Sequence, residues 1–343
     1  MTQPTAAPGP HVTPERIMQF AFAFAPPLAI ESCVRFGVFD QLDSGPKTVD
    51  EIATVSGASV RGLRSIMNML VGLGLLAKAD EARYTLTPES AAFLVSSKPG
   101  FHGGLFRHMT TQLMPNWLQM PEIVRTGKPA RAVNDEPYGS HFFEQFVESI
   151  FPMSYMAANG LGDALEIADS SSPISVLDIG AGSGVWGLVL ALKSPHVRIT
   201  AVDWPNVLTV TRRIAERMGL ADRLETSPGD LLEADFGTGH NVATIGHILH
   251  SEGEGRSREL LKRTFDALAP GGIVSIAEFV CNDDRTGPPQ SLIFSVNMLV
   301  NSDDGDTYTF PEISEWLQDA GFVDPRLLDV PGPSPLILAT RPD

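Results

Sequence analysis

Apolar residues in the first third of the chain recur at the spacing of amphipathic helices. Residues 60–74 carry apolar side chains at helical spacing, which predicts a helix with an apolar stripe. The stripe consists of Val60, Leu63, Ile66, Met67, Leu70 and Leu73. Just before it, Thr48 lies three residues ahead of Glu51, a capping-box spacing that predicts a helix over 48–57. A β-like unit follows at 75–87. Helix, turn, helix and hairpin in this order predict a winged helix.

From residue 174 the pattern changes to short apolar runs that alternate with helical segments. The apolar runs are strand-like and lie at 174–179, 197–202, 241–249 and 272–279. The segments between them are helix-like and cover 185–193, 207–218 and 257–268. This alternation predicts an α/β fold with a doubly wound, mostly parallel sheet. After a helix at 310–320, the runs 326–330 and 336–341 predict a closing hairpin whose last strand is antiparallel.

These patterns divide the chain into four parts. Residues 1–13 are expected to be a disordered tail, 14–100 a winged-helix domain, 101–170 a mostly helical connector, and 171–343 the sheet domain. At about 150 residues per domain, the length of 343 residues fits two domains. A hydrophobic content of 43% excludes a wholly disordered chain.

The charge balance limits the kinds of molecule that the protein is expected to bind. The chain has 25 Lys+Arg and 41 Asp+Glu, a net charge of −16, which argues against nucleic acid or an anionic membrane as the main partner. Residues 46–98 carry six basic and five acidic side chains without a basic stripe. We therefore expect the winged helix to be a structural module, buried in a core or a dimer interface, rather than a DNA-binding one.

The cysteines and the apolar runs help to predict the cellular compartment of the protein. Cys33 and Cys281 are far apart in sequence and offer neither a disulfide framework nor a zinc spacing. The longest apolar run starts at Ile17 and is interrupted by Gln19 and two prolines, so we expect it to be too short and too broken to cross a bilayer. The first twelve residues contain no basic segment of the kind that opens a secretory signal. Together these features predict a cytoplasmic protein.

A glycine-rich turn is the sharpest chemical signal. The segment 176–184, Val-Leu-Asp-Ile-Gly-Ala-Gly-Ser-Gly, joins a buried strand to a helix. Glycines there let the backbone approach a ligand, and the helix N-terminus favours an anionic group such as a carboxylate. We assign Asp178, Gly180 and Gly182 to a cofactor site. The match of 182–187 to G-x-G-x-x-G also allows a dinucleotide, but its first glycine falls three residues beyond the strand.

Acidic residues follow the next two strands. Asp203 ends the second strand, where an acid can accept both hydroxyls of a ribose. Asp230 follows the third, where it can accept from the amino group of adenine while Leu231 covers the ring. Open α/β sheets bind ligands at this carboxyl edge. The pattern favours an adenosyl-sulfonium cofactor over a nicotinamide dinucleotide.

The order of these motifs resembles that of the caffeate-type O-methyltransferases. The resemblance covers roughly residues 14–343 and rests on Leu-Asp-Ile-Gly-Ala-Gly-Ser-Gly, Val-Asp203-Trp-Pro, Gly-Asp230-Leu-Leu, Ile248-Leu249-His250, Ala269-Pro-Gly-Gly272, Ala277-Glu278, and the N-terminal Leu73-Gly-Leu-Leu76 and Tyr84-Thr-Leu-Thr-Pro88. It implies a Rossmann-like, seven-stranded class I methyltransferase sheet and a homodimer formed through the winged helix. It also implies S-adenosyl-L-methionine as methyl donor, S-adenosyl-L-homocysteine as product and a small aromatic acceptor.

The resemblance also assigns roles to single residues. Gly180 would line the methionine part of the cofactor, Asp203 would bind ribose, and Asp230 with Leu231 would hold adenine. His250 falls on the family's general base, and Glu278 matches a glutamate that orients it. A base helps because a phenol with a pKa of about 10 is mostly protonated at neutral pH, and an imidazole can take that proton. On these residues the reaction needs no metal ion.

The chain departs from the family pattern at several positions. Gly246, which we also assign to the cofactor site, stands where plant members often carry a cofactor-contacting lysine. Ser251-Glu252 replaces the usual Asp-Trp. Thr307 stands at the approximate place of a second glutamate, so orientation of the base would rest on one glutamate or on Asp306. Bacterial relatives with this pattern include proteins that methylate carbon or have lost methyl transfer. Carbon or nitrogen methylation, decarboxylation and hydroxylation therefore stay open, as does a nucleoside-sensing winged-helix regulator.

Two further expectations concern side chains near the predicted base. His247 lies three residues before His250 on the expected strand, so we expect it to face the other side and to be structural, with a contact on the cofactor side as the alternative. Two histidines placed in this way are poor joint ligands for a metal. The acceptor pocket is expected to draw on the connector and on one later helix, through Phe151, Met153, Met156, Asn297 and Met298.

Overall fold

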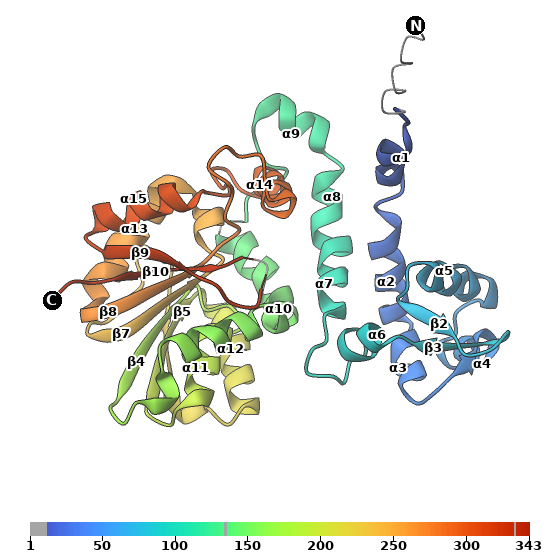
Figure 1. Cartoon of the computed structure of the whole chain (residues 1–343), viewed down its shortest axis with the longest axis horizontal. Helices are drawn as coiled ribbons and strands as arrows, with labels where there is room; N and C mark the ends of the chain where they lie inside the picture. The colour runs from blue at the N-terminus through green and yellow to red at the C-terminus, as the bar shows by residue number, and fades with distance from the viewer. Residues whose placement is uncertain (1–11, 134–135, 333) are drawn as a thin grey trace, which may run out of the picture. The chain divides into compact units, whose positions relative to one another are not determined.

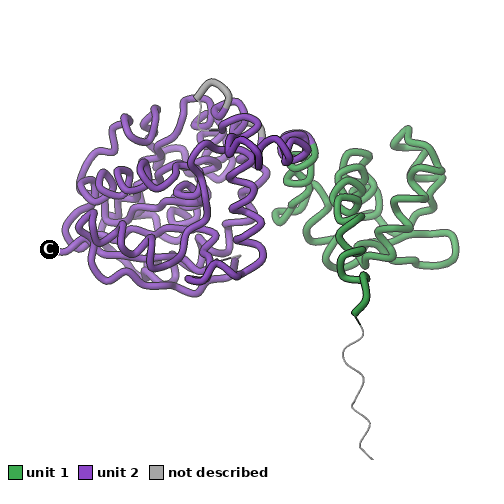
Figure 2. The backbone as a smooth tube through the Cα atoms, turned by 90° about the horizontal axis from the view of Figure 1, so that it is seen from above, with its two compact units in different colours: residues 1–110 green, residues 111–343 purple. Residues whose placement is uncertain are grey.

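The computed structural model describes residues 12–133, 136–332 and 334–343, which form two compact units. The first unit covers residues 1–110 and the second 111–343 (Figure 2). The expected disordered tail, 1–13, falls almost entirely outside the described residues. Residues 111–170, which the sequence assigns to a connector, belong to the same unit as the sheet.

The first unit is helical with a small three-stranded sheet. Its strands pair antiparallel in the order β1-β3-β2. Its elements are α1 (Glu15–Ala21), α2 (Ala25–Arg35), α3 (Val38–Asp43), β1 (Lys47–Thr48), α4 (Val49–Ser56), α5 (Val60–Gly72), β2 (Leu76–Lys78), β3 (Arg83–Leu86), α6 (Pro88–Phe93) and α7 (Gly103–His108). The sequence α4, α5 and the β2–β3 hairpin agrees with the predicted winged helix.

Local sequence explains the central helices of this unit. The Thr48 hydroxyl accepts from the Glu51 N–H at 3.2 Å, and the Glu51 carboxylate accepts from the Thr48 N–H at 2.7 Å, so the predicted capping box starts α4. Gly57 ends the helix with φ +70°, a conformation that favours glycine. In α5, Leu63, Met67 and Leu70 are buried, so the apolar stripe forms the core of the unit.

The stretch Glu15–Arg35 corrects one expectation. Within its 21 residues, a window of 18 residues has a mean hydropathy of 1.4, and by length and composition alone the stretch could cross a membrane. The expectation that the apolar run is too short was therefore wrong about its length. In the structure the stretch consists of two helices, α1 and α2, separated by the turn at 22–24. The same length and hydropathy are found in core helices of soluble proteins and in signal sequences.

The second unit is built around a seven-stranded sheet in the order β6-β5-β4-β7-β8-β10-β9. Its strands are β4 (Ile174–Ile179), β5 (Val197–Asp203), β6 (Leu224–Pro228), β7 (His240–Gly246), β8 (Leu268–Ala277), β9 (Val323–Leu328) and β10 (Leu336–Thr340). The strands from β6 to β8 pair in parallel, and β10 runs antiparallel to both of its neighbours. This confirms the predicted mostly parallel sheet and its antiparallel last strand.

Helices cover both faces of the sheet (Figure 1). The main helices are α10 (Glu136–Ala164), α11 (Val185–Lys193), α12 (Pro205–Arg217), α13 (Leu249–Ala267), α14 (Pro289–Asn301) and α15 (Phe310–Ala320), and shorter ones are α8 (Met114–Trp117) and α9 (Met120–Thr126). Consecutive residues of β4 face opposite sides of the sheet, and each side has its own hydrophobic core. Val176 packs with α10–α12, and Leu177 packs with α13 and α15. Because β4, β5, β6, β7 and β8 run parallel, their carboxyl ends lie at the same edge of the sheet.

Candidate active site

The turn after β4 is shaped by three glycines. Gly180, Gly182 and Gly184 have φ values of +61°, +55° and +76°, a region that L side chains rarely adopt. A Cβ on Gly180 would lie 2.3 Å from Cδ1 of Ile248, so no side chain fits there without displacing Ile248. The turn leads directly into α11, so the N–H groups of the first turn of this helix lie beside it. This is a cradle for an anionic group of a ligand.

Asp178 lies below this turn and its carboxylate is already engaged. Oδ2 accepts from the Gly187 N–H at 3.0 Å, and Oδ1 accepts from the Thr244 hydroxyl at 2.8 Å. The side chain is buried, and burial raises the pKa of Asp178 to about 7. Asp178 therefore ties β4 to α11 and β7; a direct contact of its side chain with a cofactor stays a prediction.

Asp203 ends β5 beside the turn. Its Oδ2 accepts from the Gly182 N–H at 2.8 Å and its Oδ1 from the Trp204 N–H at 2.7 Å. Burial raises the pKa of Asp203 to about 6. Each carboxylate oxygen has a second acceptor position, so the group can still accept from a ribose.

Asp230 has a partner that the sequence reasoning missed. The Arg256 guanidinium donates to both of its oxygens, at 3.0 and 2.8 Å, and the Leu232 N–H donates at 2.9 Å. Arg256 also pairs with Glu252 one turn earlier on α13. The i,i+4 spacing of Glu252 and Arg256 is visible in the sequence, but Asp230 is 26 residues away.

Gly246 ends β7 beneath a large side chain. A Cβ there would lie 2.0 Å from Nε1 of Trp186, which is buried on α11. The indole therefore occupies the space that any side chain at 246 would need. This is a physical reason for glycine where plant members often carry lysine.

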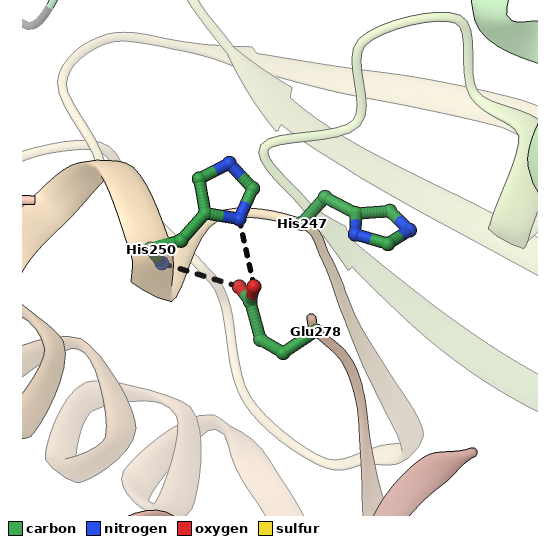
Figure 3. Close-up of side chains that lie close together, drawn as sticks. All are labelled: His247, His250 and Glu278. Carbon is green, nitrogen blue, oxygen red and sulfur yellow. Dashed lines mark hydrogen bonds and ion pairs between the residues drawn. The ribbon is translucent and has the colours of Figure 1, made fainter. Parts of the chain in front are cut away.

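His250 and Glu278 form a buried pair at the carboxyl edge of the sheet (Figure 3). His250 lies in the first turn of α13, not at the end of the strand as predicted, and Glu278 directly follows β8. Nδ1 of His250 lies 2.7 Å from Oε2 of Glu278, and the His250 backbone N–H donates to Oε1 at 3.3 Å. The two residues are 7% and 3% exposed.

The electrostatics of the pair assign the tautomer. Burial by itself would raise the pKa of Glu278, but the charge and hydrogen bonds of His250 outweigh it and hold that pKa below its usual range. An ionised carboxylate only accepts hydrogen bonds. In the neutral ring of His250, Nδ1 therefore donates its proton to Glu278, and Nε2 carries the lone pair that can accept a proton.

His247 contradicts the sequence expectation. It lies one residue beyond β7 with φ +62°, and its N–H donates to the Ala277 carbonyl at 2.8 Å. The positive φ breaks the alternation of a strand, so the ring lies with His250 and Glu278 rather than on the opposite side. The expectation that the two histidines are badly placed to share a ligand was wrong for the same reason. Burial lowers the pKa of His247 to about 4, so its ring is neutral at pH 7.

His247 carries two energetic costs. A left-handed conformation costs a non-glycine residue about 1–2 kcal/mol. Its Nδ1 is buried without a hydrogen-bond partner among the described residues, and an unsatisfied buried polar group costs about 1–3 kcal/mol.

Two phenylalanines next to the pair were not predicted from the sequence. The rings of Phe279 and Phe294 stack with centroids 4.0 Å apart, and His250 meets Phe294 edge-on at 4.8 Å. Phe279 follows Glu278, and Phe294 comes from α14. An aromatic surface therefore adjoins the imidazole, as a flat acceptor would require.

The expected pocket residues have mixed environments, and their contact with an acceptor stays a prediction. On α10, Met153 is half-buried and Met156 is 53% exposed. On α14, Met298 is buried, and the Asn297 side-chain oxygen accepts from the Trp117 indole N–H at 2.9 Å.

Neither Thr307 nor Asp306, the candidates for the place of the second glutamate, makes a hydrogen bond to His250 among the described residues. The Thr307 hydroxyl lies 3.0 Å from Sγ of Cys281 and donates to the Ser291 carbonyl at 3.2 Å. Asp306 accepts from the hydroxyl of Ser295. In the described structure the orientation of His250 rests on Glu278.

Comparisons with known proteins agree with this geometry. Residues 120–323 match the model of the O-methyltransferase domain, and residues 18–96 match that of the O-methyltransferase dimerisation domain. The chain is 32% identical to the tetracenomycin polyketide synthesis 8-O-methyl transferase of Streptomyces glaucescens, over 98% of this chain and 99% of that one. It is 30% identical to the 3-hydroxy-5-methyl-1-naphthoate 3-O-methyltransferase of Streptomyces sahachiroi, over 89% and 88%. Human N-acetylserotonin methyltransferase, solved with S-adenosylmethionine, shares the fold with a TM-score of 0.84 at 21% identity, over 98% and 100%. The chain belongs to the O-methyltransferase family and carries both its catalytic and its dimerisation domain.

Proposed function

We propose that this enzyme transfers a methyl group from S-adenosyl-L-methionine to a hydroxyl of a small aromatic acceptor, with His250 as the general base. The observation that carries the proposal is the buried pair of His250 and Glu278 at the carboxyl edge of the sheet, 2.7 Å apart. It lies next to a glycine turn and acids suited to an adenosyl cofactor. Family membership supports the same reaction.

The cofactor fits the residues at this edge. Its carboxylate would lie at the turn of Gly180 and Gly182, its ribose at Asp203, and its adenine at Asp230 and Leu231. When bound, it supplies a methyl group that is already electrophilic, and S-adenosyl-L-homocysteine is left as the product. The task of the chain is then to align the acceptor oxygen and to remove its proton.

We assign removal of the proton of the acceptor hydroxyl to Nε2 of His250. The acceptor hydroxyl would give its proton to Nε2 of His250 while its oxygen is methylated. The imidazolium that forms is stabilised by the carboxylate of Glu278 on Nδ1. Glu278 is a positioning residue, since it acts through His250, and no metal ion takes part.

The aromatic class of acceptor has two supports. Phe279 and Phe294 present an apolar, aromatic surface beside His250. Relatives with 30–32% identity are named for a tetracenomycin polyketide and a naphthoate. A 26% identical relative from Streptomyces rimosus is named an N,N-dimethyltransferase, so nitrogen is the alternative methyl acceptor, and the fragment mass of the product distinguishes the two.

The base is tested with variants of the pair. His250→Ala should leave the Kd for S-adenosylmethionine nearly unchanged and reduce turnover by about 10²–10⁴-fold, the typical share of general-base catalysis. Glu278→Gln keeps the shape but not the charge, and should lower kcat while KM for the acceptor changes little. Excess EDTA should not reduce turnover. If His250→Ala turned over at the wild-type rate, His250 would not be the general base.

The cofactor site has its own test. Asp203→Asn should weaken S-adenosylmethionine binding by about 10–100-fold, because a hydrogen bond to a charged group contributes about 1.5–3 kcal/mol. Calorimetry measures the Kd directly. The matched control is Asp222→Asn, an exposed acid after α12. Equal affinities in the two variants would refute the ribose assignment.

We further propose that the enzyme is a homodimer formed through the first unit. The dimerisation-domain match supports this, as do apolar side chains that are 54–74% exposed along α1 and the turn that follows it: Ile17, Met18, Phe20, Phe22 and Phe24. Exposed apolar patches of this kind mark interaction surfaces. Phe20→Glu with Phe22→Glu should yield monomers in light scattering, whereas Val55→Glu, 74% exposed on α4, should not.

A further inference from the structure

Three side chains that can bind a metal meet beside the predicted base. His247, His250 and Glu278 each offer one ligand atom, and these atoms all lie within 4.8 Å of one another. Figure 3 shows the two imidazole rings on either side of the carboxylate. Ligands of a tetrahedral zinc ion at about 2.0–2.2 Å are separated by about 3.3 Å, so small side-chain shifts would let all three reach one ion.

His247 has no part in the proposed methyl transfer, yet the chain holds it in place. Its backbone is in the left-handed region, fastened by the hydrogen bond from its N–H to the Ala277 carbonyl. Its ring packs against Phe279 with centroids 5.1 Å apart. Its Nδ1 is buried and has no partner in the described part of the chain. Strained backbone maintained beside an unsatisfied polar atom is typical of a binding site.

We propose that His247, His250 and Glu278 form a site for a divalent transition-metal ion such as Zn²⁺, and that its binding switches the enzyme off. Two imidazole nitrogens and one carboxylate oxygen suit zinc and its neighbours Co²⁺ and Ni²⁺. Mg²⁺ and Ca²⁺ prefer sets of oxygen ligands. The site therefore selects the transition metals over the more abundant hard cations.

The inhibitory effect follows from the tautomer of His250, and this step rests on the proposed function. Without metal, Nδ1 donates to Glu278 and Nε2 holds the lone pair that accepts the acceptor proton. A metal on Nδ1 takes the place of that proton, so the neutral ring carries its proton on Nε2. Nε2 then has no lone pair to accept another proton. The metal also occupies the carboxylate that would stabilise an imidazolium.

Binding is tested on the purified full-length chain without cofactor. Zn²⁺ titrated by calorimetry should bind at one ion per chain, and Co²⁺ should give the visible absorption of a site with nitrogen and oxygen ligands, while Mg²⁺ gives neither. The variant is His247→Asn, because asparagine tolerates the left-handed conformation and removes the imidazole. It should weaken Zn²⁺ binding by at least about tenfold. The matched control, His196→Gln, removes an exposed imidazole before β5 and should bind like wild type.

Inhibition is tested by comparing each protein with its own metal-free rate. Zn²⁺ should inhibit wild type and His196→Gln reversibly, with EDTA restoring turnover, and His247→Asn should need at least about tenfold more Zn²⁺. Equal Zn²⁺ affinity in wild type and His247→Asn would overturn the site. Binding without inhibition would overturn the switch. Because metal affinity is measured without cofactor or acceptor, the test of the metal site is independent of whether the proposed methyl transfer is correct.

Discussion

Asp178 should make the stability of the sheet unit depend on pH in a way that asparagine abolishes. Burial raises the pKa of Asp178 from an ordinary 3.8 to about 7. Between these values the folded chain holds a proton that the unfolded chain has released. The free energy of unfolding therefore falls as pH rises from about 4 to about 7. One pKa unit corresponds to 1.36 kcal/mol, so a shift of about 3 units amounts to about 4 kcal/mol.

Asparagine preserves the local hydrogen bonds without ionising. Its side-chain oxygen can accept from the Gly187 N–H, and its NH₂ group can donate to the Thr244 hydroxyl, whose own proton can turn to the Leu177 carbonyl 3.5 Å away. Asp178→Asn should therefore fold, and its unfolding free energy should lack this contribution to the pH dependence. From pH 5 to pH 8, wild type should lose about 3 kcal/mol more than the variant, because two of the three units lie in that range.

Denaturant unfolding at the two pH values measures this difference. All four tryptophans, Trp117, Trp186, Trp204 and Trp316, lie in the second unit, so their fluorescence follows the sheet unit alone. Asp222→Asn controls for the loss of one negative charge at an exposed position. If wild type and Asp178→Asn lose stability in parallel between pH 5 and pH 8, the buried carboxyl is not the source of the dependence.

Three further substitutions test packing and capping. Gly246→Ala places a Cβ 2.0 Å from Nε1 of Trp186, and should cost about 1–3 kcal/mol and shift the tryptophan emission; an unchanged spectrum would contradict the contact. Gly180→Ala forces a left-handed alanine against Ile248, and should lower both the melting temperature and the affinity for S-adenosylmethionine in calorimetry. Thr48→Ala removes the capping box of α4, and should cost about 1 kcal/mol of unfolding free energy, measured by the circular dichroism of helices.

Local features of the fold were predictable because neighbouring residues decide them. The bounds of β4 and α11 coincide with the predicted 174–179 and 185–193, since a buried apolar run and a glycine turn mark both ends. The capping box at Thr48 formed as its spacing indicates. The strand before Asp230 was implied by the motif order, and β6 occupies 224–228.

Contacts between distant segments were not predictable in the same way. The alternation of a strand placed His247 opposite His250, but β7 ends at Gly246 and a left-handed residue follows. The hydrogen bond from the His247 N–H to Ala277, the last residue of β8, accompanies that turn. Arg256 reaches Asp230 only because α13 packs beside the turn after β6.

The sequence by itself determined the class of the protein: a winged helix followed by a mostly parallel sheet whose edge carries a glycine turn, Asp203 and the His250 motif. These follow from periodicity, turn chemistry and spacing, which act over a few residues. Only the tertiary structure decided which side chains share the space around His250. Glu278 comes 28 residues later, Phe294 comes from another helix, and His247 turns toward them through a single positive φ. Their proximity depends on packing across the sheet edge, which no local pattern encodes.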